Sequence, residues 1–114
     1  MKPWLLVIGV LVVWVLLVKL RPSAAGAASA KDKVKGGALV VDVRTAAEYK
    51  GGHVDGALNI PVQELESRLG ELKDKQRAIV VYCASGIRSA RAAAILRKAG
   101  FADVTNAGGY GSLK

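Results

Sequence analysis

The sequence predicts an α/β fold with a small, mostly parallel sheet flanked by helices. Short apolar runs alternate with helical patterns along the chain, and glycine or proline bounds most of the runs. Such alternation is typical of a parallel sheet whose strands are buried on both faces. A strand, a tight loop and a helix also surround the only cysteine, Cys83. In this fold the cysteine would lie at the carboxyl edge of the sheet, beside a helix N-terminus.

The first part of the chain has the pattern of a membrane anchor. Residues 4–18 contain no charged side chain, and Lys19 and Arg21 follow them. A helix over this stretch and its flanks would be about 27 Å long at about 1.5 Å per residue, close to the hydrocarbon thickness of about 30 Å. We therefore predict a transmembrane helix, a signal-anchor, over residues 1–21, in contact with membrane lipid through residues 4–20.

The charges on either side of this stretch predict its orientation. Lys2 precedes it, whereas several basic residues follow it, namely Lys19, Arg21, Lys31, Lys33 and Lys35. The positive-inside rule then places the following domain in the cytoplasm, as a single-pass protein of the inner membrane. The alternative is a secretory signal peptide cleaved after a small-residue site at residues 25–27 or 28–30, which would release the domain into the periplasm.

A linker and one small domain are expected to follow. Residues 22–30 carry no charge and consist mostly of alanine and serine. This composition predicts a linker over residues 22–35, although its alanines would also allow a short helix through Lys35. The α/β domain is then expected over residues 36–114.

The elements of this domain follow from apolar runs and helical periodicity. The expected strands cover residues 38–42, 57–60, 78–82 and 102–106. The expected helices cover residues 45–50, 62–72 and 88–99, and Gly100 ends the last of them. Thr45 and Glu48 have the spacing of a capping box at the start of the first helix. Val62, Leu65, Leu69 and Leu72 share the apolar face of the second.

The loop after the third strand has the composition of a site for an anionic sulfur. The N–H groups at a helix N-terminus favour a thiolate, which is the nucleophilic form of cysteine. Ser85 and Gly86 permit close approach of the backbone, and Arg88 adds a positive charge. We therefore predict that Cys83 is a nucleophile. The alternative is an inert cysteine that closes a hydrophobic strand.

Loop length and a second motif then indicate a family. Cys83 and Arg88 enclose four residues, one fewer than in the loops of tyrosine phosphatases, and this loop resembles that of the rhodanese family of sulfurtransferases. Further stretches similar to that family are Asp-Val-Arg-Thr-Ala-Ala-Glu-Tyr at 42–49, Gly-His-Val-Asp-Gly-Ala-Leu-Asn-Ile-Pro at 52–61 and Gly-Gly-Tyr at 108–110. The resemblance covers about residues 38–112. The strand that usually begins the family's fold has no clear counterpart here.

The resemblance implies a sulfurtransferase that works through a persulfide on Cys83. Sulfane sulfur would come from a small anionic donor, thiosulfate or a persulfide, and pass to cyanide or to a thiol of a small molecule or protein, without a cofactor. The residues implied in substrate binding are Ala84, Ser85, Gly86, Ile87, Arg88 and Ser89. The alternative is a membrane-tethered binding or scaffold module without turnover. A phosphatase is a third interpretation, which the short loop disfavours.

Other polar residues near this site have an expected structural role. Asp42, Arg44 and Glu48 are expected to form a charge network at a strand end, in which Arg44 with Glu48 fixes the loop. His53 is expected to join loop and strand rather than to act as a general base. A single cysteine and a single histidine cannot build a metal site. The net charge of +8 is attributed to an anionic membrane surface and anionic substrates, not to nucleic acid.

Overall fold

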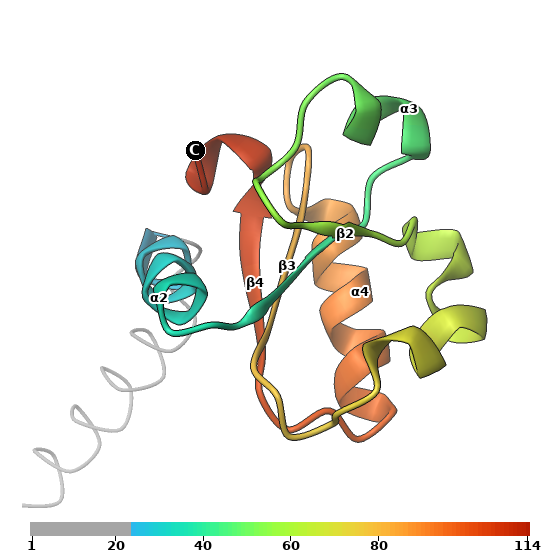
Figure 1. Ribbon diagram of the computed structural model, residues 1–114. Helices are drawn as coiled ribbons and strands as arrows, with labels where there is room; N and C mark the ends of the chain where they lie inside the picture. The colour runs from blue at the N-terminus through green and yellow to red at the C-terminus, as the bar shows by residue number, and fades with distance from the viewer. Residues whose placement is uncertain (1–23) are drawn as a thin grey trace, which may run out of the picture.

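The computed structural model describes residues 24–114, in which four parallel strands form one sheet with helices on both faces (Figure 1). The strands are β1 (Leu39–Asp42), β2 (Leu58–Asn59), β3 (Ile79–Cys83) and β4 (Val104–Gly109). Their order across the sheet is β2-β1-β3-β4, and each neighbouring pair is parallel. The predicted α/β fold with a parallel sheet is therefore confirmed.

The helices cover the two faces of this sheet. The α-helices are α2 (Ala24–Lys35), α3 (Ala46–Lys50) and α4 (Ile87–Lys98), and the 3₁₀ turns are η1 (Val62–Glu64), η2 (Glu66–Leu72) and η3 (Tyr110–Ser112). Helix α2 lies on one face, and α4 lies on the other (Figure 1). The transmembrane helix predicted over residues 1–21 falls outside the described residues. Between residues 24 and 114, no helix is long and apolar enough to cross a membrane.

Alternating strand residues build two separate cores. Val81 and Cys83 of β3 pack on the α4 face, together with Leu96. Val80 and Tyr82 pack on the α2 face. Successive side chains of a strand point to opposite faces of the sheet, so a strand buried on both faces reads as a continuous apolar run. This is the pattern from which the sequence predicted the strand.

The segment predicted as a linker over residues 22–35 is helical from Ala24 onward. Helix α2 packs against β4 and β3, and Ala30 has no exposed surface. Lys33 also pairs with Asp103, just before β4. The small Ala30 side chain lets the helix approach the sheet closely, so a composition that suggested a flexible linker instead supplies a packing contact. The domain therefore begins before residue 36, and the helical alternative is the one observed.

The helix predicted over residues 62–72 is replaced by the 3₁₀ turns η1 and η2. Arg68 breaks the helical backbone with φ −118° and ψ 15°. The predicted apolar face is nevertheless the buried one, because Val62, Leu65 and Leu72 are buried and Leu69 packs against them. In a 3₁₀ turn residues i and i+3 lie on the same side, which the spacings 62–65 and 69–72 satisfy.

The predicted capping box at the start of α3 is confirmed. The Thr45 Oγ1 accepts a hydrogen bond from the Glu48 N–H at 3.2 Å, and the Glu48 Oε1 accepts one from the Thr45 N–H at 3.1 Å. These reciprocal bonds satisfy two N–H groups that have no partner inside the helix. They also fix the Glu48 carboxylate on α3, and α3 lies at the end of the sheet where β3 leads into α4 (Figure 1).

Candidate active site

Cys83 is the last residue of β3 and lies beneath the loop that leads into α4. The cysteine has no exposed surface. Ala84 and Ser85 are exposed at the outer side of the loop, and Ile87, the first residue of α4, is 79% exposed. The loop therefore covers the sulfur and presents its own outer residues to solvent.

Two hydrogen-bonding groups converge on the Cys83 Sγ. The Gly86 N–H donates to it at 2.9 Å, and the Ser89 Oγ lies 3.4 Å from it. Gly86 has φ 102°, in the left-handed region that favours glycine, and this conformation turns its N–H toward the sulfur. The Gly86 N–H is therefore a fixed donor to the sulfur, and the Ser89 hydroxyl, which also lies 3.1 Å from the Gly86 carbonyl oxygen, can donate to a thiolate.

The pKa of the Cys83 thiol is lowered from its ordinary value. Burial raises this pKa, because desolvation disfavours the thiolate. Hydrogen bonds from the Ser89 hydroxyl and from the backbone N–H groups of Ser89, Gly86 and Ser85 act in the opposite direction and prevail. The direction agrees with the prediction of a site that favours thiolate.

The loop packs closely against the end of β4. An added Cβ on Gly109 would lie 2.7 Å from the Ala84 carbonyl oxygen, and one on Gly86 would lie 3.3 Å from the Gly108 Cα. A register shift between β3 and β4 at this end leaves Ala107 as an extra residue. The sequence reasoning used Gly108 and Gly109 only as part of the family resemblance. Two glycines at a strand end were the available signal for this close approach.

Arg88 is held by a carboxylate rather than left free above the loop. Its guanidinium donates to both Glu48 oxygens, with Nη1 to Oε1 at 2.7 Å and Nη2 to Oε2 at 3.0 Å. Arg88 lowers the pKa of Glu48 to about 2, with help from the Thr45 N–H and hydroxyl. The predicted network of Asp42, Arg44 and Glu48 is thus divided, because Glu48 points across to Arg88 of α4.

Arg44 instead pairs with Asp42 inside the domain. Its Nε and Nη2 reach the two carboxylate oxygens of Asp42 at 3.0 and 2.7 Å, and Nη2 also donates to the Gly52 carbonyl at 2.7 Å. The Tyr82 hydroxyl donates to Asp42 at 2.7 Å and accepts from the Val54 N–H at 3.0 Å. This network fixes the loop before β2. Sequence reasoning missed Tyr82, which reads only as an apolar strand residue.

His53 lies in the same loop and contacts α3. Its Nδ1 donates to the Tyr49 carbonyl at 2.8 Å, and the two rings stack with centroids 3.6 Å apart. These contacts hold the loop against α3. Among residues 24–114, no group of three His, Cys, Asp or Glu side chains is placed to hold a metal ion.

These features define the class of protein. In an α/β domain with a parallel sheet, a cysteine ends a strand at the carboxyl edge, and the Gly86 N–H and the Ser89 hydroxyl contact its sulfur. The family model described as a Rhodanese-like domain matches residues 26–113. The chain therefore belongs to the rhodanese-like family, as the loop and the 42–61 motif predicted.

Curated relatives are similar over the region of the motifs. The thiosulfate sulfurtransferase PspE of Escherichia coli is 41% identical over 70 residues, which are 60% of this chain and 67% of that protein. The protein YqhL of Bacillus subtilis is 41% identical over 69 residues, and the match spans only 54% of its length. The sulfurtransferase of Allochromatium vinosum is 41% identical over 68 residues, or 63% of its length.

Solved structures share the fold. A rhodanese with anions from E. coli is 39% identical, with a TM-score of 0.62 over 65% of this chain and 88% of that one. The human single-domain sulfurtransferase TSTD1 is 33% identical, with a TM-score of 0.63 over 69% of this chain and 82% of that one.

Proposed function

We propose that this protein transfers sulfane sulfur from a small anionic donor to a thiol or cyanide through a persulfide on Cys83. The observation that carries the proposal is the pair of contacts to the Cys83 Sγ, from the Gly86 N–H at 2.9 Å and the Ser89 hydroxyl at 3.4 Å. Relatives named thiosulfate sulfurtransferase and sulfurtransferase, each 41% identical, support the same activity.

In the first step the Cys83 thiolate attacks the outer sulfur of thiosulfate. A new S–S bond forms on Cys83, the S–S bond of thiosulfate breaks, and its electron pair leaves with sulfite. The negative charge on cysteine moves to the outer sulfur of the persulfide, about 2 Å farther out. The N–H groups of the loop stabilise this charge as they stabilise the thiolate.

In the second step an acceptor removes the outer sulfur. Cyanide attacks it to give thiocyanate, or a thiolate attacks it to give a new persulfide, and the Cys83 thiolate is restored. The chain has no second cysteine that could resolve the persulfide internally, so the acceptor thiol must belong to another molecule. Splitting the transfer into two displacements is covalent catalysis by an activated nucleophile.

Cys83→Ser tests this mechanism, because serine is nearly isosteric but carries no sulfane sulfur. We expect the wild type to gain the mass of one sulfur atom after thiosulfate and to form thiocyanate from cyanide, and the variant to do neither while keeping its far-UV circular dichroism. Substantial thiocyanate from the variant would contradict the mechanism. A wild type that gains no sulfur would instead favour the non-catalytic binding module, and faster hydrolysis of an aryl phosphate would favour a phosphatase.

We further propose that residues 4–20 hold the protein in the inner membrane with the domain in the cytoplasm. The uncharged stretch over residues 4–18 and the basic residues after it support this placement. Protease added to intact spheroplasts should spare the domain and digest it only after lysis. Digestion before lysis would place it in the periplasm, and a mature N-terminus at Ala28 or Lys31 would identify a cleaved signal peptide.

A further inference from the structure

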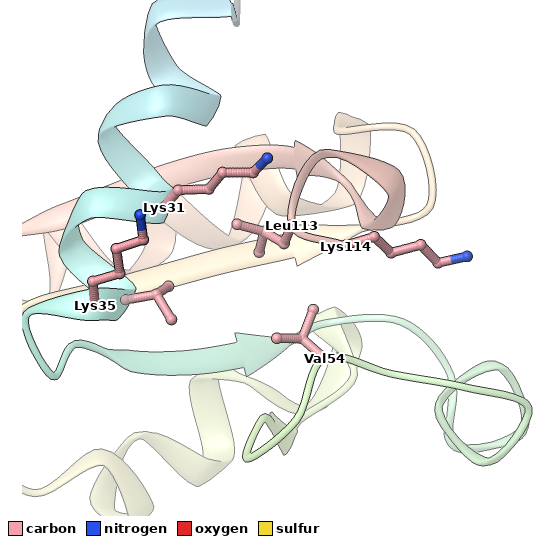
Figure 2. A pocket seen from close by; sticks show the side chains of 6 residues that line it. Lys31, Lys35, Val54, Leu113 and Lys114 are labelled. Atoms are coloured by element: carbon pink, nitrogen blue, oxygen red, sulfur yellow. The ribbon is translucent and has the colours of Figure 1, made fainter.

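Two adjoining hollows form a groove between α2, the loop before β2 and the end of the chain. One has a volume of about 350 Å³ and is lined by Lys31, Val34, Lys35, Val54, Leu113 and Lys114 (Figure 2). The other, of about 370 Å³, shares four of these residues and adds His53, Asp55 and Tyr110. We call the first set of six residues the lysine groove. None of them belongs to the proposed persulfide site.

The lysine groove combines an aliphatic floor with a cationic rim. Val34, Val54 and Leu113 are partly buried and pack on the α2-face core. Three lysines lie on its rim, and the exposed Asp55 lines the adjoining hollow. Lys31 and Lys35 are exposed one turn apart on α2, and the Lys114 ammonium lies 4.6 Å from the centroid of the Tyr110 ring. No carboxylate within residues 24–114 pairs with any of these three lysines, although Lys33 of the same helix pairs with Asp103.

The Leu113 end of the groove lies at the same edge of the sheet as the persulfide loop, whereas Lys35 lies just before the start of β1 (Figure 2). Tyr110 directly follows Gly109, which abuts Ala84 of that loop, and its ring stacks on Tyr82, the residue before Cys83. Leu113 comes four residues after Gly109, so their Cα atoms are at most about 14 Å apart. An extended partner segment that fills the groove between α2 and Leu113 can therefore continue past Leu113 to the loop.

We propose that the lysine groove docks an acidic and aliphatic segment of a protein that exchanges sulfur with Cys83. The unpaired lysines complement acidic side chains, and such complementarity speeds association and selects partners. The concave aliphatic floor accepts an inserted side chain, which a flat bilayer surface would leave unfilled. The inference rests on the proposed function, since it names the partner class of the same sulfur transfer.

The test uses the full-length chain in a neutral detergent, loaded with sulfur from thiosulfate. Two synthetic peptides each carry one cysteine at the same position, beside a tail of glutamate and leucine in one and of glutamine and leucine in the other. We expect the acidic peptide to remove sulfur from Cys83 about tenfold more efficiently. This advantage should lie mainly in KM and should shrink as salt is added, because salt screens charge pairs at the surface. A second version of each peptide has serine in place of cysteine and cannot accept sulfur. Fluorescence anisotropy of these two peptides measures binding alone.

Charge-reversed variants locate the effect. Lys31→Glu combined with Lys35→Glu should remove the advantage of the acidic peptide while leaving sulfur transfer to cyanide unchanged. The matched control combines Lys73→Glu with Lys98→Glu, which reverses two exposed lysines outside the groove. This control has the same net charge and should keep the advantage. Leu113→Ser should weaken binding of both peptides, because it removes part of the shared aliphatic floor.

The outcomes separate the groove from the activity. The proposal would be overturned if the wild type transferred sulfur to the two peptides with equal efficiency. It would also be overturned if the two double variants lost the advantage of the acidic peptide to the same extent. The wild type could instead show no preference between the peptides but bind phosphatidylglycerol vesicles more tightly than phosphatidylcholine vesicles. If only the Lys31→Glu, Lys35→Glu variant lost that lipid preference, the groove would bind a lipid surface and the proposal would be overturned. Failure of the wild type to transfer sulfur to cyanide would refute the proposed function instead, and the anisotropy measurement would still decide whether the groove binds acidic peptides.

Discussion

Two arginine–carboxylate pairs brace the carboxyl edge of the sheet, and they differ in burial. In the Arg44–Asp42 pair the side chains are 8% and 0% exposed. In the Arg88–Glu48 pair they are 33% and 34% exposed. The buried pair also engages Tyr82 and the loop before β2, whereas the outer pair joins α3 to the persulfide loop.

The difference separates the stability of the scaffold from the position of the site. A buried carboxylate that loses its partner leaves an uncompensated charge in a medium that solvates it poorly, so such a pair is costly to break. A half-exposed pair is solvated whether or not it forms, and it contributes little to stability. We therefore expect the inner pair to control folding and the outer pair to control the geometry around Cys83.

The largest effect should come from breaking the inner pair. Asp42→Ala leaves the Arg44 guanidinium buried without a carboxylate, with only the Gly52 carbonyl as acceptor, and removes an acceptor from Tyr82. We expect the free energy of unfolding to fall by about 3–5 kcal/mol, as measured by urea denaturation. Asp103→Ala is the control, because its partly exposed pair with Lys33 should cost less than about 1 kcal/mol. A similar small loss for Asp42→Ala would show that the inner pair is dispensable.

A smaller effect should come from the second contact that positions the loop. Gly109 has φ −84°, so alanine fits its backbone, but an added Cβ would meet the Ala84 carbonyl oxygen at 2.7 Å. Gly109→Ala must displace the loop, at a cost of about 1–3 kcal/mol. We expect sulfur transfer to fall by at least tenfold. Gly111→Ala is the control, since no atom lies near its Cβ position, and equal activities of the two variants would contradict the close approach.

The two pairs also show how far sequence reasoning reaches. The capping box of Thr45 and Glu48 and the loop after Cys83 depend on neighbours in the sequence, and both were predicted. The partner of Glu48 is forty residues away, on Arg88, so local spacing could not identify it. Arg44 lies two residues after Asp42, a spacing that places side chains on the same face of a strand. That spacing was the available signal for the pair that forms.

The N-terminal boundary of the domain was missed for a similar reason. Helix α2 is fixed by the fully buried Ala30 and by the pairing of Lys33 with Asp103. An alanine-rich, weakly amphipathic segment has the same sequence pattern whether it packs on a sheet or links two domains. Its place depends on a face of the sheet that forms only when β3 and β4 pair.

Removing the outer pair should affect activity more than stability. Glu48→Gln retains an acceptor for the Thr45 N–H but takes the charge away from Arg88. We expect sulfur transfer to fall several-fold and the free energy of unfolding to fall by less than about 1 kcal/mol. Glu71→Gln, which breaks a pair with Arg68 in η2, should change neither quantity appreciably. A loss of stability as large as that for Asp42→Ala would remove the distinction between the two pairs.

The smallest effect is the pH dependence of the outer pair. Arg88 holds the pKa of Glu48 at about 2, below the ordinary value of 4.5 that applies in the unfolded chain. The unfolded state therefore binds the proton more readily, and the stabilisation is complete above about pH 4.5 and lost as pH falls toward 2. Because both side chains are about one-third exposed, we expect the whole effect to stay below about 1 kcal/mol and to shrink with added salt.

The measurement is the difference in unfolding free energy between wild type and Glu48→Gln, compared at about pH 6 and about pH 2.5. The difference should narrow at the lower pH, where the wild-type carboxylate begins to take up the proton that glutamine never binds. A difference that stayed constant between these two pH values would mean that Arg88 does not hold Glu48 ionised in the folded protein.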